Sequence, residues 1–167
     1  PYTTLFRSLS NIASVGSRRV VLVTSDAVAV GRRRFSGESL TRGEESVARK
    51  QAFAAIGQPE LMHLYAEEFG FYGKRVAQVL LTRDDTSNRE RYLNARTTFR
   101  ALCALPDVVP IVNENDTVAT DEIRFGDNDS LASLVVSVVG ADALVILSDV
   151  SAVHTADPTR DPNARPI

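Results

Sequence analysis

The sequence predicts an α/β protein, a three-layer αβα sandwich in which a mainly parallel sheet lies between helices. Continuous β-branched runs such as residues 19–24 (RVVLVT) are typical of buried parallel strands. These runs alternate with segments of helical spacing, which is the pattern of a parallel sheet with helical crossovers. Several predicted strands end in polar residues, and open α/β sheets bind their ligands at this edge.

The composition is typical of a soluble globular protein. The chain has 167 residues, 44% hydrophobic and 24% charged, which suits one soluble domain with a sizeable core. A formal charge of −2 gives no reason to expect nucleic acid or an anionic membrane as a partner. No apolar run approaches the roughly 20 residues that span a bilayer. Without a secretory signal, the expected location is the cytoplasm.

The sequence predicts that the chain is truncated at both ends. Residues 1–8 (PYTTLFRS) match the in-frame translation of a common sequencing-adapter end, so we expect them to be non-native. The alternative is that they belong to a real helix. Residues 9–167 are expected to form a partial domain, because the last predicted strand and loop are followed by no closing element.

The amino-terminal half predicts one strand and several helices. The expected elements are a helix end at residues 9–15, a strand at 19–24, a polar loop or flap with solvated arginines at 32–43, and helices at 44–56 and 60–69. Gly57 is expected to separate the last two helices, because glycine weakens a helix and Pro59 suits the first turn of the next one.

The carboxyl-terminal half continues the alternation. The expected elements are a strand at residues 75–81, a turn at 84–88, a helix at 88–105, a strand at 108–112, a hairpin arm at 123–125, a helix at 131–139 with Asp127 or Asn128 as its cap, and a strand at 143–147. Cys103 lies in the apolar pattern of the helix predicted at 88–105. A lone cysteine there is expected to pack as a small hydrophobe.

An acid-rich loop follows the strand at 108–112 and is the main candidate site. Between residues 113 and 129 it holds many carboxylates and amides against one base, Arg124. Like charges at this density repel, so the folded loop needs cations, donors or backbone amides around it. Ser25 follows the first strand and is either a ligand donor or a plain helix cap. In a parallel sheet, Ser25, this loop and the Ser148-Asp149 pair should meet at one edge.

The residues leave the reaction open. Carboxylates could bind an amino group or Mg²⁺, while amides and hydroxyls could hold a carboxylate or phosphate. Phosphoryl transfer also needs cations, and the only lysines, Lys50 and Lys74, lie away from the strand ends. There is no P-loop and no dinucleotide fingerprint. The residues alone therefore indicate an α/β enzyme for a polar small molecule.

Motifs spread over the chain resemble the amino-acid kinase family, and within it the glutamate 5-kinases and the kinase half of the pyrroline-5-carboxylate synthases. The matching stretches are VLVTS at 21–25, Lys50-Gln51 with residues 54–58, residues 78–83, 89–96 and 109–120, GDND at 126–129, Gly140-Ala141-Asp142, Ser148-Asp149 and residues 155–158. NEND followed by GDND is the most specific part. The resemblance implies the αβα fold of this family, which the acetylglutamate kinases share.

The resemblance also implies a reaction and roles for the residues. The reaction is ATP-dependent phosphorylation of the γ-carboxylate of L-glutamate, the first step of proline synthesis, with ATP and Mg²⁺ as cofactors and a homo-oligomeric intact protein. The implied roles are glutamate binding by Ser25, Asp116 and Asn128, contact with ATP by Ser148 and Asp149, and organisation of catalytic lysines by Asp129 with Asp127 beside it. No residue is assigned to a metal.

Some positions depart from the family. Asp26 and Ala152 stand where glycine is usual, and His154 where an aromatic residue is usual. The family's lysine-bearing segments would precede residue 9 and follow residue 167. Two alternatives therefore stay open: a sibling kinase with another acceptor, and a non-catalytic binding or assembly fragment.

Overall fold

A parallel three-stranded sheet forms the centre of the computed structural model, which describes residues 2–16, 18–35, 46–119, 128–147, 152, 155–156, 161 and 163–167. The elements in chain order are α1 (Tyr2–Ser14), β1 (Leu22–Val23), α2 (Ala27–Arg33), α3 (Val47–Gly70), β2 (Arg75–Leu81), α4 (Arg83–Ser87), α5 (Arg89–Ala104), β3 (Val108–Glu114) and α6 (Asn128–Val139). The predicted α/β class with a parallel sheet is confirmed.

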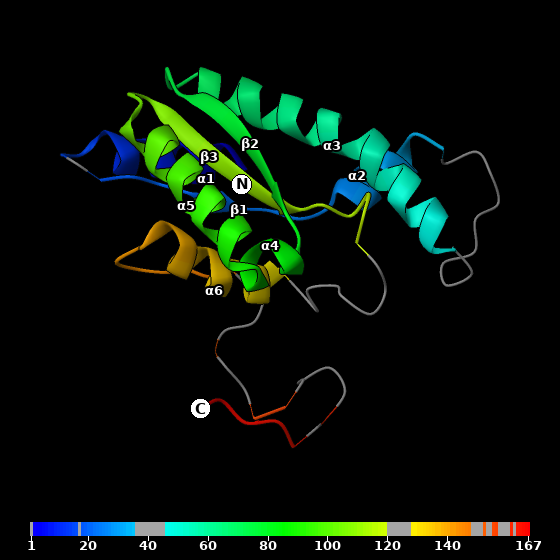
Figure 1. Cartoon of the computed structure of the whole chain (residues 1–167). Helices are drawn as coiled ribbons and strands as arrows, with labels where there is room; N and C mark the ends of the chain where they lie inside the picture. Colours follow the sequence, from blue (N-terminus) through cyan, green and yellow to red (C-terminus); the bar gives the residue numbers. More distant parts are fainter. Residues whose placement is uncertain are drawn as a thin grey trace.

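The strand β3 lies in the middle of the sheet, in the order β1-β3-β2 (Figure 1). It pairs with β2 along its whole length, from Arg75 opposite Val108 to Leu81 opposite Glu114. Its pairing with β1 is short and joins Leu22 to Ile111 and Val23 to Val112. All three strands run in the same direction, so their carboxyl ends meet at one edge.

The strand β1 is shorter than the predicted strand at 19–24, and Pro110 explains the difference. Thr24 N donates to the carbonyl of Val112, so Val112 directs its backbone polar groups towards β1. The side to which the backbone N–H and C=O groups point alternates from one residue of a strand to the next. Pro110, two residues earlier, therefore also faces β1. Proline has no N–H to donate, so the ladder between β3 and β1 cannot extend towards residue 20.

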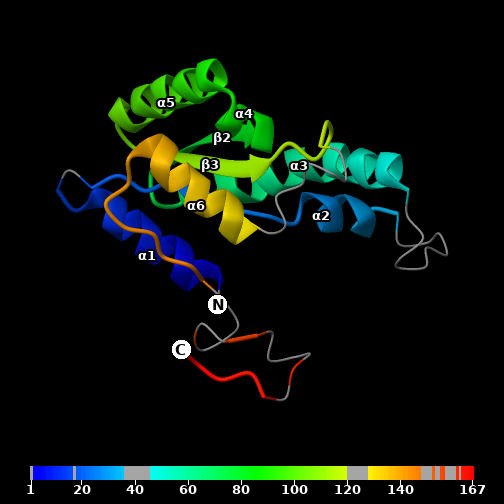
Figure 2. The same ribbon diagram turned by 60° about the horizontal axis from the view of Figure 1, so that its bottom comes forward.

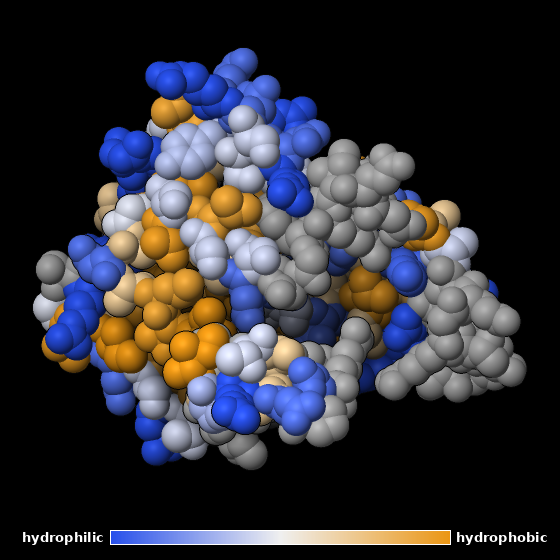
Figure 3. Space-filling view, turned by 90° about the horizontal axis from the view of Figure 1, so that it is seen from below, coloured by the Kyte–Doolittle hydropathy of each residue, from blue (hydrophilic) through white to orange (hydrophobic). Residues whose placement is uncertain are grey.

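The prediction of a strand at 143–147 is wrong. Gly140, with φ of 67°, ends α6 as expected, but the segment after it joins no sheet in the described part of the chain. Leu144 to Leu147 are exposed, and Val145 is 77% accessible. Figure 3 views the molecule from the side of α6 and shows hydrophobic side chains gathered there. A β-branched run becomes a strand only where it meets a sheet edge, and this segment does not reach one.

The predicted break at Gly57 is also wrong, because α3 runs unbroken from Val47 to Gly70 through both Gly57 and Pro59. Gly57 serves a close helix crossing instead. A Cβ at Gly57 would lie 1.9 Å from the carbonyl oxygen of Ala27, and one at Gly31 would lie 2.0 Å from that of Phe53. The helices α2 and α3 therefore touch through their backbones, which only glycine at these two positions allows.

The other predicted helices and strands agree with the structure to within a few residues. α5 corresponds to the helix predicted at 88–105, and β2 to the strand predicted at 75–81. α6 corresponds to the helix predicted at 131–139 and begins three residues earlier, at Asn128. The turn predicted at 84–88 is the short helix α4, and α2 extends into the start of the predicted loop at 32–43. The predicted hairpin arm at 123–125 lies outside the described residues. No helix in the described ranges is long and apolar enough to cross a membrane.

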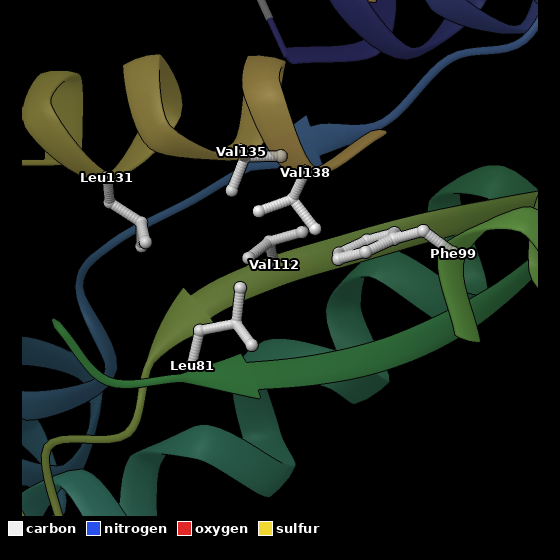
Figure 4. Close-up of a cluster of buried hydrophobic side chains, with 6 residues drawn as sticks. All are labelled: Leu81, Phe99, Val112, Leu131, Val135 and Val138. Carbon is white, nitrogen blue, oxygen red and sulfur yellow. The ribbon is translucent and has the colours of Figure 1, made fainter. Parts of the chain in front are cut away.

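Helices cover both faces of the sheet, as predicted. Figure 2 shows α5 and α1 on opposite sides of the strands. On the side of α5 and α6, the core consists of Leu81, Phe99, Val112, Leu131, Val135 and Val138 (Figure 4). On the side of α1 and α3, it consists of Phe6, Phe69, Val109 and Ile111. β3 thus buries alternate side chains in two cores, as a central parallel strand must.

The first eight residues contribute to the second core. Phe6 is 6% exposed and its ring contacts those of Tyr65 and Phe69 edge to face. A helix that starts in this segment can therefore cover the sheet, whatever the origin of the segment. The non-native origin of residues 1–8 stays a prediction.

An ion pair closes the sheet at the amino ends of the strands. The side chain of Lys74 is 7% exposed, and its Nζ donates to Oδ1 of Asp107 at 2.7 Å. Asp107 has a left-handed backbone with φ of 59°. The hydrogen bond from Lys74 and its charge hold the pKa of the Asp107 carboxyl below its usual value.

We expect Gly57→Ala to lower the free energy of unfolding by about 3 kcal/mol or more, because the new methyl group meets the backbone of α2. Gly70→Ala is the matched control in the same helix, since its Cβ would meet nothing within 4 Å. The control should leave stability within about 1 kcal/mol or raise it. Urea unfolding of both variants checks this, and equal effects at the two positions would contradict the close crossing.

The pair between Lys74 and Asp107 predicts a pH dependence. A carboxyl whose pKa is lowered on folding stabilises the protein above its unfolded pKa, and the effect disappears as pH falls through the folded pKa. Asp107→Asn keeps a residue that tolerates the left-handed backbone but removes the charge. Its urea midpoint should lie below that of the parent at about pH 7 and converge with it below about pH 4. A constant difference across this range would contradict the ion pair as its source.

Candidate functional site

A pocket of about 250 Å³ opens at the carboxyl ends of β1 and β3. Ser25 to Ala29 form one wall together with Arg32 of α2. Asn113, Glu114 and Asp116 form a second wall, and Asn128 at the start of α6 contributes to the lining. Segments far apart in the sequence thus meet at the edge where the parallel topology brings the strand ends together.

The first wall is set by the end of β1. Thr24 N donates to the Val112 carbonyl, which continues the line of β1 for one residue. The Thr24 hydroxyl hydrogen-bonds to the Tyr65 hydroxyl of α3. The chain then turns through Ser25 and Asp26 into α2, so Ser25 is presented at the pocket by a strand end that is fastened to both β3 and α3.

Asp26 adopts the left-handed conformation that the family's usual glycine would take without strain. Its φ is 81° and its ψ is 5°, and it precedes α2 without a side-chain cap hydrogen bond. Its backbone carbonyl accepts from Val30 N at 2.8 Å and so begins the helix. A left-handed residue other than glycine costs about 1 kcal/mol, and here it also adds a carboxylate to the pocket.

The second wall begins with a buried asparagine. Asn113 is 2% exposed, and its Oδ1 accepts from Glu114 N at 2.9 Å. Asn115 N donates to the carbonyl of Leu81 in β2. The Asn115 carbonyl in turn accepts from Val118 N and Ala119 N, which closes a tight turn. Asp116 lies in this turn and is half-buried at the pocket.

The third contribution comes from the start of α6. Asn128 is half-buried and lines the pocket, whereas Asp129, its neighbour, is exposed and does not. Asp127, Ser148 and Asp149 lie outside the described residues. The structure therefore brings the three predicted glutamate-binding residues, Ser25, Asp116 and Asn128, to one pocket. Their roles, and those of the other four, stay predictions.

The described lining has an excess of negative charge. Asp26, Glu114 and Asp116 are carboxylates, and Arg32 is the cation among the described lining residues. Such a site favours an ammonium group near the acids, and its hydroxyl and amide groups can hold a carboxylate. No cluster of three or more histidine, cysteine, aspartate or glutamate side chains suited to a metal exists in the part of the chain that the structure describes.

A second hollow of about 310 Å³ lies at the opposite end of the sheet, where the strands begin. Its lining includes Arg18, Arg19 and Lys74, together with Asp107, which pairs with Lys74. None of the sequence-predicted site residues that the structure describes lies there. Ser25, Asp116 and Asn128 line the smaller pocket instead.

The pocket lining includes three polar residues, Arg32, Asn113 and Glu114, for which the sequence predicts no individual role. Arg32 was expected to be solvated in a loop, but α2 extends far enough to bring it to the pocket wall. Asn113 and Glu114 belong to the acid-rich stretch, and a strand that changes from apolar to polar at Asn113 marks the point where it leaves the core. In the sequence, this change from apolar to polar residues is the signal that marks Asn113 and Glu114 as candidate pocket residues.

Comparison with known proteins identifies the family of the chain. The model of the amino acid kinase family matches residues 2–167. The chain is 51% identical over 150 residues to a glutamate 5-kinase of Meiothermus ruber, a match that covers 90% of this chain and 39% of that protein. It is 51% identical over 164 residues to one of Nostoc sp., covering 98% and 42%, and 53% identical over 150 residues to one of Thermus thermophilus, covering 90% and 40%. The chain thus spans about two-fifths of the length of these relatives, and it belongs to the amino acid kinase family.

Proposed function

We propose that the protein transfers the γ-phosphoryl group of ATP to the γ-carboxylate of L-glutamate, forming γ-glutamyl phosphate and ADP. A carboxylate oxygen forms the new bond to phosphorus, and the bond between that phosphorus and the β–γ bridging oxygen breaks. The observation that carries this proposal is that Ser25, Asp116 and Asn128 line one pocket. Similarity to proteins named glutamate 5-kinase supports it.

The chemistry of the described lining fits glutamate. The Asp116 carboxylate suits the substrate ammonium group, and the Ser25 hydroxyl and Asn128 amide suit its carboxylates. Glutamate carries two carboxylates and one ammonium group, so Arg32 offsets part of the repulsion from the acids of the lining. Fixing the substrate in this way lowers the entropic part of the barrier to phosphoryl transfer.

Neither lysine of the chain lines the pocket. Lys74 lies at the opposite end of the sheet and pairs with Asp107, and Lys50 is not part of the pocket lining. Transfer of a phosphoryl group needs cations around the developing charge. ATP contact by Ser148 and Asp149, a role for Mg²⁺, lysine organisation by Asp129 and Asp127, a homo-oligomer and a cytoplasmic location therefore stay predictions.

The proposal is tested with the protein expressed from its complete open reading frame. Coupled release of ADP should depend on L-glutamate and not on aspartate, carbamate or UMP. Asp116→Asn should raise KM for glutamate by about tenfold or more and leave KM for ATP within about twofold, because its partner is the substrate ammonium. Asp84→Asn, an exposed acid outside the pocket, is the control. Absence of glutamate turnover would reject the proposal.

Two substitutions at Asp26 separate the effect of its backbone strain from the effect of its charge. We expect Asp26→Gly to raise the free energy of unfolding by about 1 kcal/mol, because glycine adopts the left-handed backbone freely. Both Asp26→Gly and Asp26→Asn should lower KM for glutamate, because each removes a carboxylate from the pocket. Unchanged stability in the glycine variant would contradict the strain, and unchanged KM in both would contradict the repulsion.

A further inference from the structure

The helix α3 reaches the carboxyl ends of the strands with one row of polar side chains. Gln51 Nε2 donates to the carbonyl of Ala119 at 3.1 Å. Gln58 Oε1 accepts from Asn113 Nδ2 at 2.9 Å. Tyr65 hydrogen-bonds to Thr24. Positions 51, 58 and 65 are two helical turns apart, so all three lie on one face of the helix.

Gln58 is the most buried member of this row. It is 8% exposed, and its partner Asn113 is 2% exposed. A buried amide without a partner is costly, so each of these side chains constrains the other. Asn113 also accepts from Glu114 N, and it therefore joins α3 to the first residue of the acid-rich turn.

Gln58 itself does not line the pocket, whereas Asn113, Glu114 and Asp116 do. Its Nε2 donates to Oε1 of Gln78 in β2 at 3.4 Å. An apolar pair of similar size could fill the space between α3 and β3 with little loss of stability. A polar pair does what apolar packing cannot, because it fixes the rotation of the Asn113 amide and hence the direction in which the chain leaves β3.

We infer that Gln58 is a positioning residue for the pocket: through Asn113, it sets the course of the chain from Glu114 to Asp116 and so the affinity for the substrate. The substrate named in the test rests on the proposed function. The geometry of the Gln58–Asn113–Glu114 chain does not depend on that function.

The test uses the protein expressed from its complete open reading frame, with Gln58→Met, Gln58→Asn and Gln78→Met. Methionine keeps the length of the side chain without its amide, and Gln58→Asn keeps an amide that is too short to reach Asn113. Gln78→Met is the matched control, since Gln78 is exposed, contacts Gln58 and lies outside the pocket. If one substitution at position 58 prevents folding, the other is measured in its place.

Both variants at position 58 should raise KM for glutamate by roughly tenfold while kcat and KM for ATP stay within about twofold. Hydrogen exchange at the Glu114 amide, which Asn113 holds, should also become about tenfold faster. The control should match the parent protein in both measurements. A loss of stability alone, with KM and exchange unchanged, would show that Gln58 only packs and would overturn the inference.

The two measurements separate this inference from the proposed function. If the parent protein phosphorylates glutamate and the position-58 variants match it in KM and exchange, the inference fails and the function stands. If the parent protein does not phosphorylate glutamate, the function fails, and exchange at Glu114 decides the inference alone. Faster exchange then supports it and unchanged exchange overturns it.

Discussion

The backbone contact between α2 and α3 is the constraint on which the site depends. Without side chains at Gly31 and Gly57, carbonyl oxygens of each helix lie where a methyl group of the other would be. This proximity fixes α2, and with it the turn through Ser25 and Asp26, against a long helix that also packs on the sheet. The next residue along α3, Gln58, bonds to the end of β3. Two consecutive residues of one helix therefore hold both walls of the pocket.

The central strand, β3, supports the second wall of the pocket. Val109 and Ile111 face one core and Val112 faces the other, so β3 has no freedom to shift without exposing apolar surface to water. Its last buried residue, Asn113, is polar, and beyond it the chain leaves the core as an acid-rich turn. The carboxylates consequently stand on a rigid base while their own charges remain near solvent, where an ammonium group can reach them.

Local pattern was enough to predict the sheet class, the strands β2 and β3, the helices α5 and α6, and the meeting of Ser25 with Asp116 at one edge. The failures share a cause, since each depends on a distant residue. Gly57 looks like a helix breaker until α2 is placed against it. The length of β1 depends on Pro110 in another strand. The apolar run at 143–147 has the composition of a strand, but its structure depends on whether a sheet edge is within reach. Gln58 belongs to a sequence motif, but the motif does not indicate that its side chain bonds to Asn113.

Pro110 has a consequence for how the molecule fluctuates. On the amino-terminal side of Leu22, the side chains of Val20 and Val21 pack in the two cores, and Arg19 Nε donates to the carbonyl of Cys103. No donor from Pro110 holds this part of the segment. Opening that segment would therefore expose apolar surface without first breaking a ladder bond to this residue. Transient local unfolding should begin there, at the end of the sheet remote from the pocket. The carboxyl edge can then keep its geometry while the opposite edge opens transiently.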